Sequence, residues 1–484
     1  MRRLRALLHG GLLQQVHRRV LRQVLLIGSV GVSGLGLVWV IANASVVPVY
    51  GDTNEYLALA RTLRVDQYRT ILYPGLLWVC RAAPGDGDPP FPAAVYAVQW
   101  GVLVTSTAIF AFALASAAGL SRSRRRMSLV LATVVLVGTN PLIAHFALSL
   151  LTDSLASSFT MGFVGALALT IDDGVRVRPG RRLWLGITLV YLVLMAWSRV
   201  EKLYLGAALV FLTSIWLLRN TRAAGTVTGR RVVLLSGLFA AALGAVVLLN
   251  RAAQTPNPNR PPLDLSSLAF NRVVWPRLAR VYPYLSPEAQ AVVPFEAAVR
   301  FDAHNNQVYP FLSDLLQQRP DSRRIIDEIT LTTLRTFPLA VLGKTAFDTA
   351  KYTLPNLAFP LERAGLFPQS IATAWTVARM ASAHPGLTWT VLLAAETFFL
   401  IVQLPVALAA LLAGRERRLW RHPIFLLTVS TVLTNALLFG LESGIDAHVR
   451  YALPAYVMIH AWVAFLSVAW WYDLARTPRV PPHR

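Results

Sequence analysis

The feature that most constrains the fold is a series of apolar runs, each close to the length that crosses a bilayer. They recur along the whole 484-residue chain, which is 55% hydrophobic and 14% charged, whereas an ordinary soluble domain is about one-quarter charged. A membrane-spanning helix needs about 20 apolar residues. The sequence therefore predicts an all-α integral membrane protein, a polytopic helical bundle with amphipathic helices on its extracytoplasmic face.

About ten transmembrane helices are expected. The predicted spans are Val24–Val46, Ala93–Ala118, Met127–Ala147, Leu155–Ile171, Leu183–Trp197, Leu203–Leu218, Val232–Leu249, Trp389–Leu412, Ile424–Leu441 and Ala452–Trp471. The first run is too long for a signal peptide and lacks a small-residue cleavage site, so it is expected to stay as an anchor. The fifth and sixth runs flank the charged "SRVEK", which favours a hairpin with that turn at the surface.

The basic residues predict the orientation of the bundle. Six basic segments all fall on one side if there are ten spans: the N-terminus, 121–126, 176–182, 219–231, 414–422 and the C-terminal tail. The positive-inside rule makes that side the cytoplasm of a cell (inner or plasma) membrane, with both termini cytoplasmic. The net charge of +22 is then explained by orientation and by contact with anionic lipid, and a nucleic-acid partner is not expected.

Three regions follow from this span assignment. Residues 1–249 form an N-terminal transmembrane module, 250–388 an extracytoplasmic helical loop region, and 389–484 the C-terminal transmembrane helices with a basic cytoplasmic tail. Within the loop region, "SPEAQAVVPFEAAVRFD" and "RRIIDEITLTTLRTF" predict amphipathic helices. The stretch "FPLAVLGKTAFDTAKYTL" could lie in the membrane interface, with Lys344 and Lys351 reaching to the surface. The alternative is that residues 329–366 contain a further membrane-embedded segment.

Several activities are disfavoured by missing motifs. The sequence has no Walker A motif, no Rossmann glycine fingerprint, no HExxH and no G-x-S-x-G. Its single cysteine, Cys80, excludes an intrachain disulfide and a cysteine-based metal site. The cytoplasmic loops are short and basic, so any chemistry is expected on the outer face. An enzyme there has no ATP or nucleotide sugar and needs an activated substrate that has already crossed, such as a lipid-linked one.

Four short motifs on that outer face resemble the GT-C superfamily of glycosyltransferases, which includes protein O-mannosyltransferases and the lipid A aminoarabinose transferase. "YGDTNEYLALARTL" followed by "YRTILYPGLL" resembles the first outer loop of that family. "LTDSLASSF" resembles its second acidic position, "SRVEKLYL" an arginine-containing turn, and "HVRYALPAYVMI" the start of the last span in many members. The separate C-terminal soluble domain of the family is missing.

The resemblance implies inverting transfer of a hexosyl or pentosyl group from a polyprenyl-phosphate donor to an extracytoplasmic acceptor, with Asp52 as catalytic base. The acceptor would be a cell-envelope glycan, lipid or protein, and the arginine-rich composition suits a GC-rich bacterium. The expected substrate-binding residues are Tyr56, Arg69, Tyr73, Asp153, Arg199, Glu201, Lys202, His448, Arg450 and Tyr451. No cofactor is required. A divalent metal is left open, with Asp153 as the candidate ligand and His145 as a weaker one.

The expected reaction explains the need for these residue types independently of the family resemblance. A hydroxyl is a poor nucleophile until a positioned carboxylate accepts its proton. A phosphate leaving group needs cations rather than a second carboxylic acid, and arginine binds phosphate through paired donors. One carboxylate with several Arg or Lys residues is therefore sufficient, unlike the two-carboxylate site of a glycosidase.

Structural roles remain open for the same residues. Asp52 and Asp153 could cap helices, Arg69 could pair with Asp66 or Glu55, and Arg199, Glu201 and Lys202 could form a local ion cluster. Other functions also remain: a lipid-linked oligosaccharide polymerase or ligase, a transporter or flippase of lipid-linked substrates, or a membrane scaffold. Glu396 is the main ionisable residue inside a span, and it is expected to meet a polar partner in the bundle.

Overall fold

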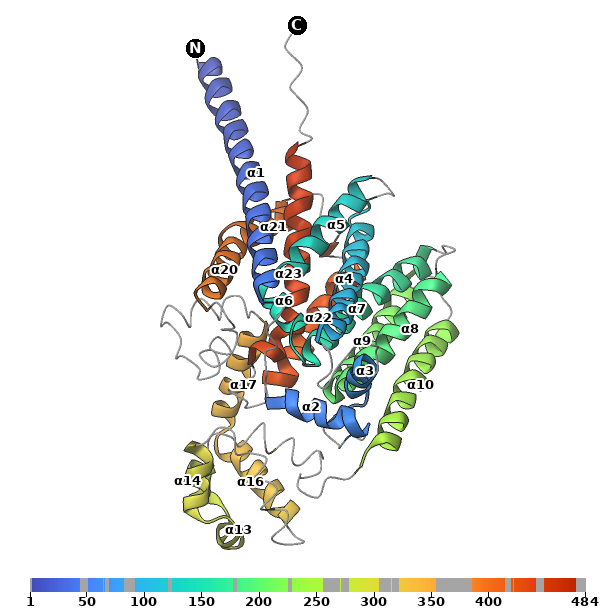
Figure 1. Cartoon of the computed structure of the whole chain (residues 1–484), viewed down its shortest axis with the longest axis vertical. Helices are drawn as coiled ribbons and strands as arrows, with labels where there is room; N and C mark the ends of the chain where they lie inside the picture. The colour runs from blue at the N-terminus through green and yellow to red at the C-terminus, as the bar shows by residue number, and fades with distance from the viewer. Residues whose placement is uncertain are drawn as a thin grey trace.

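Every regular element in the described part of the chain is helical (Figure 1). The computed structural model describes residues 2–43, 51–63, 65, 69–81, 92–120, 124–176, 181–224, 229–255, 270, 278–303, 315, 322–353, 385–413, 419–420, 422–440 and 448–475. Side chains at some helix ends, including 2–18 and 448–451, are outside this description. One isolated bridge joins Val65 to Gln254. The chain is thus all-α over the described residues.

Seven helical segments in the described residues are long and apolar enough to cross a membrane. They are contained in α1 (Arg2–Asn43), α4 (Pro92–Ala117), α7 (Asp153–Arg176), α9 (Val200–Ala224), α10 (Gly229–Ala253), the run of α20 (Pro385–Phe398), η2 (Phe399–Gln403) and α21 (Leu404–Ala413), and α23 (His448–Ala475). A multi-pass membrane protein follows from their length and composition. The eighth predicted span is one such segment, and it carries a π-helical turn at η2.

The three other predicted spans are shorter or bent. α8 (Arg181–Ser198) and α22 (Pro423–Gly440) are apolar but short, and α5 (Arg124–Gly138) meets α6 (Pro141–Ala147) at a bend of 72°. The predicted span Met127–Ala147 thus consists of two helices joined at a bend, which is either one broken span or a re-entrant segment. Pro141 disfavours a helical conformation at Asn140, whose side chain instead accepts hydrogen bonds from the backbone N–H groups that start α6. The total of ten spans stays a prediction.

The centre of the bundle is formed by α7 and α23, whose membrane segments are almost entirely buried, while α1 and α10 lie at its edge. α7 packs against α4 and α8. Its sequence contains small residues that permit this close approach. A Cβ atom on Gly165 would lie 2.8 Å from the Cα of Phe110, and one on Gly162 would overlap the ring of Tyr191. The small side chains of α7 thus allow two neighbouring helices to pack tightly against it.

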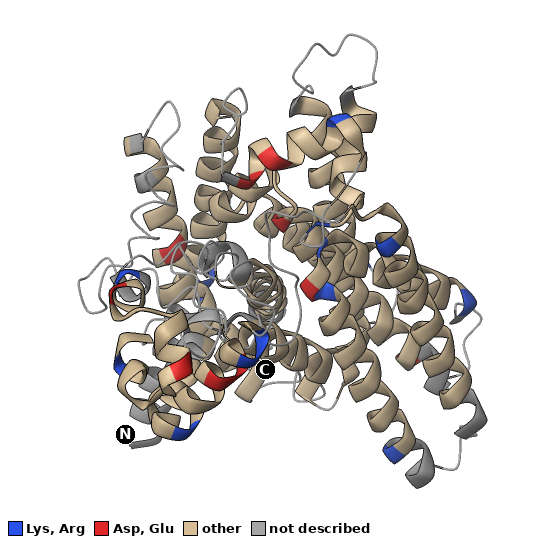
Figure 2. Ribbon diagram, turned by 90° about the horizontal axis from the view of Figure 1, so that it is seen from below, with Lys and Arg blue, Asp and Glu red and all other residues tan. Residues whose placement is uncertain are grey.

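The end of the molecule opposite the two chain termini carries the first loop and the long loop region. Figure 1 shows α2 (Gly51–Thr62) at that end, with α13 (Pro287–Val292), α14 (Phe295–Ala303) and α16 (Ser322–Thr336) beyond it. The bridge between Val65 and Gln254 joins the loop after α2 to the end of α10. Figure 2 looks onto this end and shows both acidic and basic residues on the described helices.

The long loop region contains a small hydrophobic core of its own. Ile325, Ile326 and Ile329 on α16 are fully buried and pack with Leu278 and Val281 of α12 (Leu278–Val281) and with residues of α13 and α14. Their spacing is that of one face of a helix. The two amphipathic helical stretches predicted from the sequence are therefore confirmed.

The next helix, α17 (Pro338–Thr353), packs against α22 and α23. Leu339 and Leu342 on α17 are exposed large apolar residues, which suits contact with lipid. The side chains of Lys344 and Lys351 lie outside the described residues. The structure thus joins α17 to the bundle, and the choice between an interfacial and an embedded segment stays open.

Candidate active site

The first loop forms an ion cluster around Arg69. Asp52 lies in the first turn of α2, and Glu55 is three residues further on, so both carboxylates share one face of the helix. Nη2 of Arg69 donates hydrogen bonds to Oδ1 of Asp52 at 2.9 Å and to Oε2 of Glu55 at 2.8 Å. The guanidinium also lies 5.1 Å from the ring centre of Tyr56. Arg69 is therefore held by one helical face through two charges and a ring.

A second ion cluster surrounds Arg199, which lies between α8 and α9. Its Nη1 donates to Oδ1 of Asp153 at 2.5 Å, and its Nε is 2.6 Å from Oε1 of Glu201. The side chain of Asp153 is 1% exposed, whereas that of Asp52 is 29% exposed. Asp153 is thus enclosed and neutralised by its arginine, while Asp52 remains accessible to water.

The two clusters adjoin through the packing of α2 on the turn before α7. The hydroxyls of Tyr56 and Thr152 are 3.2 Å apart, and Thr152 is the neighbour of Asp153 in the chain. Thr53 donates to the carbonyl of Leu150 at 3.4 Å. The charges of both Arg69 and Arg199 act on Tyr56. Residues distant in sequence therefore form one polar region at this end of the bundle.

Two buried tyrosines pack against each other beside Arg69. The rings of Tyr56 and Tyr73 meet edge to face with 5.1 Å between their centres. Burial raises the pKa of Tyr56 above its ordinary value, although the charges of Arg69 and Arg199 act in the opposite direction. Burial also raises the pKa of Tyr73, and Tyr56 adds to that effect. Both phenols therefore stay neutral at physiological pH.

Arg69 stays charged despite its burial. Loss of solvent alone would lower its pKa, but the carboxylates of Asp52 and Glu55 act in the opposite direction, and the pKa lies above the ordinary value. Its Nε–H finds no hydrogen-bond acceptor among the described residues, and neither does the hydroxyl of Tyr73. Polar groups buried in this way are usually satisfied in proteins. The region thus carries two donors that could serve a bound molecule.

Lys202 extends the region toward the last helices of the bundle. Its ammonium donates to Oδ1 of Asn435 on α22 at 2.6 Å, and both side chains are buried. The charges of Asp153, Arg199 and Glu201 all act on Lys202. Thr70, next to Arg69, donates to the carbonyl of Ser198 at 3.1 Å. The polar region is therefore built from the first loop and from the ends of α7, α8, α9 and α22.

Most of the residues proposed from the sequence meet here, and some lie outside the description. The residues brought together are Asp52, Tyr56, Arg69, Tyr73, Asp153, Arg199, Glu201 and Lys202. The side chains of His448, Arg450 and Tyr451, and all of Asp66, fall outside the described residues. Arg69 pairs with Glu55, one of the two partners expected, and also with Asp52. Arg199 and Glu201, two of the three residues of the local ion cluster that the sequence left open, form an ion pair.

Sequence analysis did not select Glu55, Thr152 or Asn435 as site residues. Glu55 could have been found from its position three residues after Asp52, since residues at that spacing share a helix face. Asn435 could have been noticed as an amide inside an apolar span, where polar groups need partners. Thr152 carries no comparable signal, because its role depends on how α2 packs.

A metal centre finds little support in the described residues, which contain no group of three His, Cys, Asp or Glu side chains able to hold an ion. Asp153, the candidate ligand, is bound by Arg199. The ring of His145 lies against Trp39 and Phe146. The described contacts of His145 are therefore those of a ring packed among aromatic side chains.

No protein-family model, curated protein or solved structure matches the chain.

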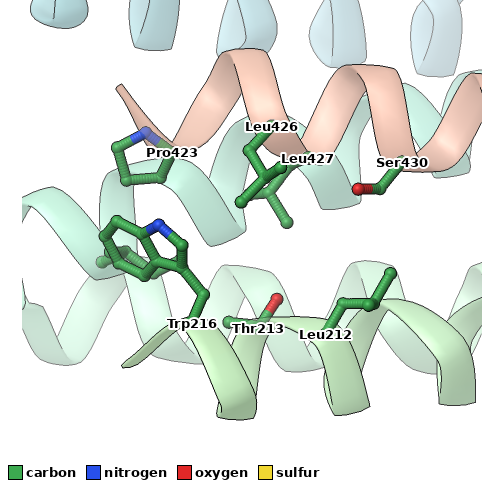
Figure 3. Close-up of a pocket in the computed structure, with 8 residues that line it drawn as sticks. Leu212, Thr213, Trp216, Pro423, Leu426, Leu427 and Ser430 are labelled. Atoms are coloured by element: carbon green, nitrogen blue, oxygen red, sulfur yellow. The ribbon is translucent and has the colours of Figure 1, made fainter. Parts of the chain in front are cut away.

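A small pocket lies away from the polar region around Asp52, between α9 and α22 (Figure 3). It is lined by apolar residues together with Thr213 and Ser430. Its volume is about 10 Å³, which is room for a single water molecule. The polar region around Asp52 is accordingly the better candidate for chemistry.

Proposed function

We propose that the chain is an inverting glycosyltransferase of GT-C type in the plasma membrane of a bacterium. It moves a sugar from a polyprenyl-phosphate donor to an acceptor hydroxyl outside the cytoplasm. The proposal includes about ten spans with both termini in the cytoplasm, so that α2 faces outward. An extracytoplasmic site suits this donor, because a sugar already linked to a lipid phosphate needs no nucleotide for its transfer.

The observation that carries the proposal is the position of Asp52 in one of two adjoining ion clusters, which are centred on Arg69 and Arg199. Asp52 is the most exposed of the four carboxylates bound to these arginines, at 29% against 23% for Glu55, 23% for Glu201 and 1% for Asp153. A base must reach the proton that it takes. Asp52 is therefore the carboxylate that an incoming hydroxyl meets most easily.

In the proposed reaction, the acceptor oxygen attacks the anomeric carbon from the face opposite the phosphate. Its proton passes to the carboxylate of Asp52, the bond between the anomeric carbon and the phosphate oxygen breaks, and polyprenyl phosphate leaves with the electron pair. Each guanidinium has five N–H donors, so Arg69 and Arg199 can hold their carboxylates and still donate to phosphate. The unsatisfied Nε–H of Arg69 and hydroxyl of Tyr73 are further donors for the substrate.

The test is transfer of a labelled sugar from synthetic polyprenyl-phosphate donors by the purified full-length protein. Asp52→Asn keeps the shape of the side chain but cannot accept the proton, and a loss of about 10²–10⁴-fold in rate is expected. Glu55→Gln is the matched control on the same helix face and should lose much less. Full activity in a folded Asp52→Asn protein, or equal losses in the two variants, would overturn the role of Asp52.

Transport of a lipid-linked substrate is the second candidate, and one observation favours it. Glu396 is buried within the membrane segment of α20, where its carboxylate accepts a hydrogen bond from the hydroxyl of Tyr456 on α23. Ionisable residues at such a depth are often part of a transport pathway. Movement of an intact lipid-linked sugar across proteoliposomes, without transfer to any acceptor, would support this candidate over the enzyme.

A further inference from the structure

A long groove runs along the side of the bundle, at the end that carries the two chain termini. It lies between α1, α5 and α23 and has a volume of about 540 Å³, within the range of about 300–1,000 Å³ that small-molecule sites occupy. Figure 1 shows these three helices together near that end. The groove is separate from the polar region around Asp52.

The lining of the groove is apolar with a few small polar groups. The apolar lining includes Leu25, Val30 and Leu37 of α1 and Val135 and Leu136 of α5. Hydroxyl groups come from Ser29, Ser33, Ser128 and Thr139. A Cβ atom on Gly34 would meet no other atom within 4 Å, so the space beside this glycine is open. Such a lining suits a hydrocarbon chain and offers little to a polar solute.

The length of the groove matches one leaflet of a bilayer. Along α1 it extends from Leu25 to Leu37, which is about 18 Å at 1.5 Å per residue. Half of the hydrocarbon core is about 15 Å thick. The groove is therefore long enough along α1 for one acyl chain of a membrane lipid.

Positive charge lies at the end of the groove near Leu25. Arg22 precedes Leu25 by one turn of α1, and its guanidinium is 5.0 Å from the ring centre of Trp471, which lines the groove. Arg124 is exposed one turn before Ser128 on α5. Trp471 and Tyr472 also line the groove, and both residue types are enriched where membrane helices meet lipid headgroups. None of the residues that line the groove is acidic.

We infer that this groove binds one anionic phospholipid of the leaflet on the side of the termini. The acyl chain lies between α1, α5 and α23, and the phosphate lies against Arg22 and Arg124. Basic pockets between membrane helices bind anionic headgroups in this way. The membrane segment of α1 is largely unburied in the bundle, and the bound lipid covers part of its exposed surface.

Native mass spectrometry of the full-length protein, with phosphatidylglycerol and phosphatidylcholine of the same acyl chains, tests the inference. We expect one retained phosphatidylglycerol and weaker retention of phosphatidylcholine. Arg22→Gln/Arg124→Gln should lose about fivefold in retention for each arginine. Arg182→Gln, at an exposed position on α8 outside the groove, is the control and should retain the lipid.

A second pair of variants tests the groove itself. Gly34→Leu places a side chain in the open space and should abolish retention, whereas Gly31→Leu, which also meets no atom within 4 Å but does not line the groove, should not. Equal retention of the two phospholipids, or equal retention by the two glycine variants, would overturn the inference. Displacement of phosphatidylglycerol by equimolar polyprenyl phosphate would also overturn it, and would assign the groove to the sugar donor.

Discussion

Arg69 donates a hydrogen bond of 2.9 Å to Asp52, and the same nitrogen donates to Glu55, one turn later on α2. Two carboxylates at this spacing repel each other in the absence of a cation. Arg69 therefore has two effects at once. It stabilises the charged face of α2, and it holds the proposed base in a defined place beside the turn that precedes α7.

Replacement of Arg69 by alanine should destabilise the protein. The two carboxylates on α2 lose a shared charge-assisted donor, and we expect the free energy of unfolding to fall by about 1–3 kcal/mol. Arg61→Ala is the matched control, because Arg61 is an exposed arginine at the end of the same helix. Denaturation in detergent micelles measures both variants. Equal stability of the two would show that the Arg69 pairs contribute nothing.

The buried pair of Asp153 and Arg199 should show strong coupling. Arg199→Ala leaves the carboxylate of Asp153, only 1% exposed, without its cation, and a loss of about 3–5 kcal/mol is expected. Asp153→Asn combined with Arg199→Ala removes both charges and should recover part of that loss. A double-mutant cycle on unfolding free energies gives the coupling. Additive effects of the single changes would contradict a direct interaction.

The sequence was sufficient to predict where the described residues form apolar helices, because each predicted span is a run of mostly apolar residues. It did not predict the bend at Asn140, since hydropathy averaged over a window does not register one side chain that caps a new helix. The partner of Arg69 was also undecided between Asp66 and Glu55. That choice depends on the packing of α2 against Leu150 and Thr152, which no local pattern encodes.

The same limit applies to the site as a whole. Asp52 and Arg69 could be chosen from the sequence because charges near a span end are unusual there. Their closeness to Arg199 could not be derived, because it follows from long-range packing of the first loop on α7 and α9. The groove beside α1 has no sequence signal either, since its lining residues are ordinary for a membrane helix.

Gly165 should tolerate no side chain. A Cβ atom there would lie 2.8 Å from the backbone of Phe110 on α4, and backbone cannot move aside as a flexible side chain can. Gly165→Ala is therefore expected to lower the free energy of unfolding by about 1–3 kcal/mol. Gly186→Ala on α8 is the control, because its Cβ would meet no atom within 4 Å and alanine favours the helix. Equal thermal midpoints for the two variants would refute the close packing of α4 on α7.

Tyr456 should matter more to stability than the charge of Glu396. The hydroxyl of Tyr456 donates to the buried carboxylate of Glu396, and the amide of Asn140 donates to the same hydroxyl at 3.3 Å. Tyr456→Phe removes this link and should cost about 1–3 kcal/mol, because buried polar groups lose a partner. Glu396→Gln keeps an oxygen that can accept the bond and should cost less.

The Glu396→Gln variant also separates the two functions considered for this chain. If the protein is a glycosyltransferase with Asp52 as base, Glu396 has only a structural role, and the variant should transfer sugar at a rate within about twofold of the original protein. Arg69→Ala and Asp52→Asn should instead lose activity. If Glu396→Gln abolishes function in a folded protein while Asp52→Asn leaves it intact, the buried carboxylate of Glu396, and not Asp52, performs the essential step, and transport becomes the better explanation.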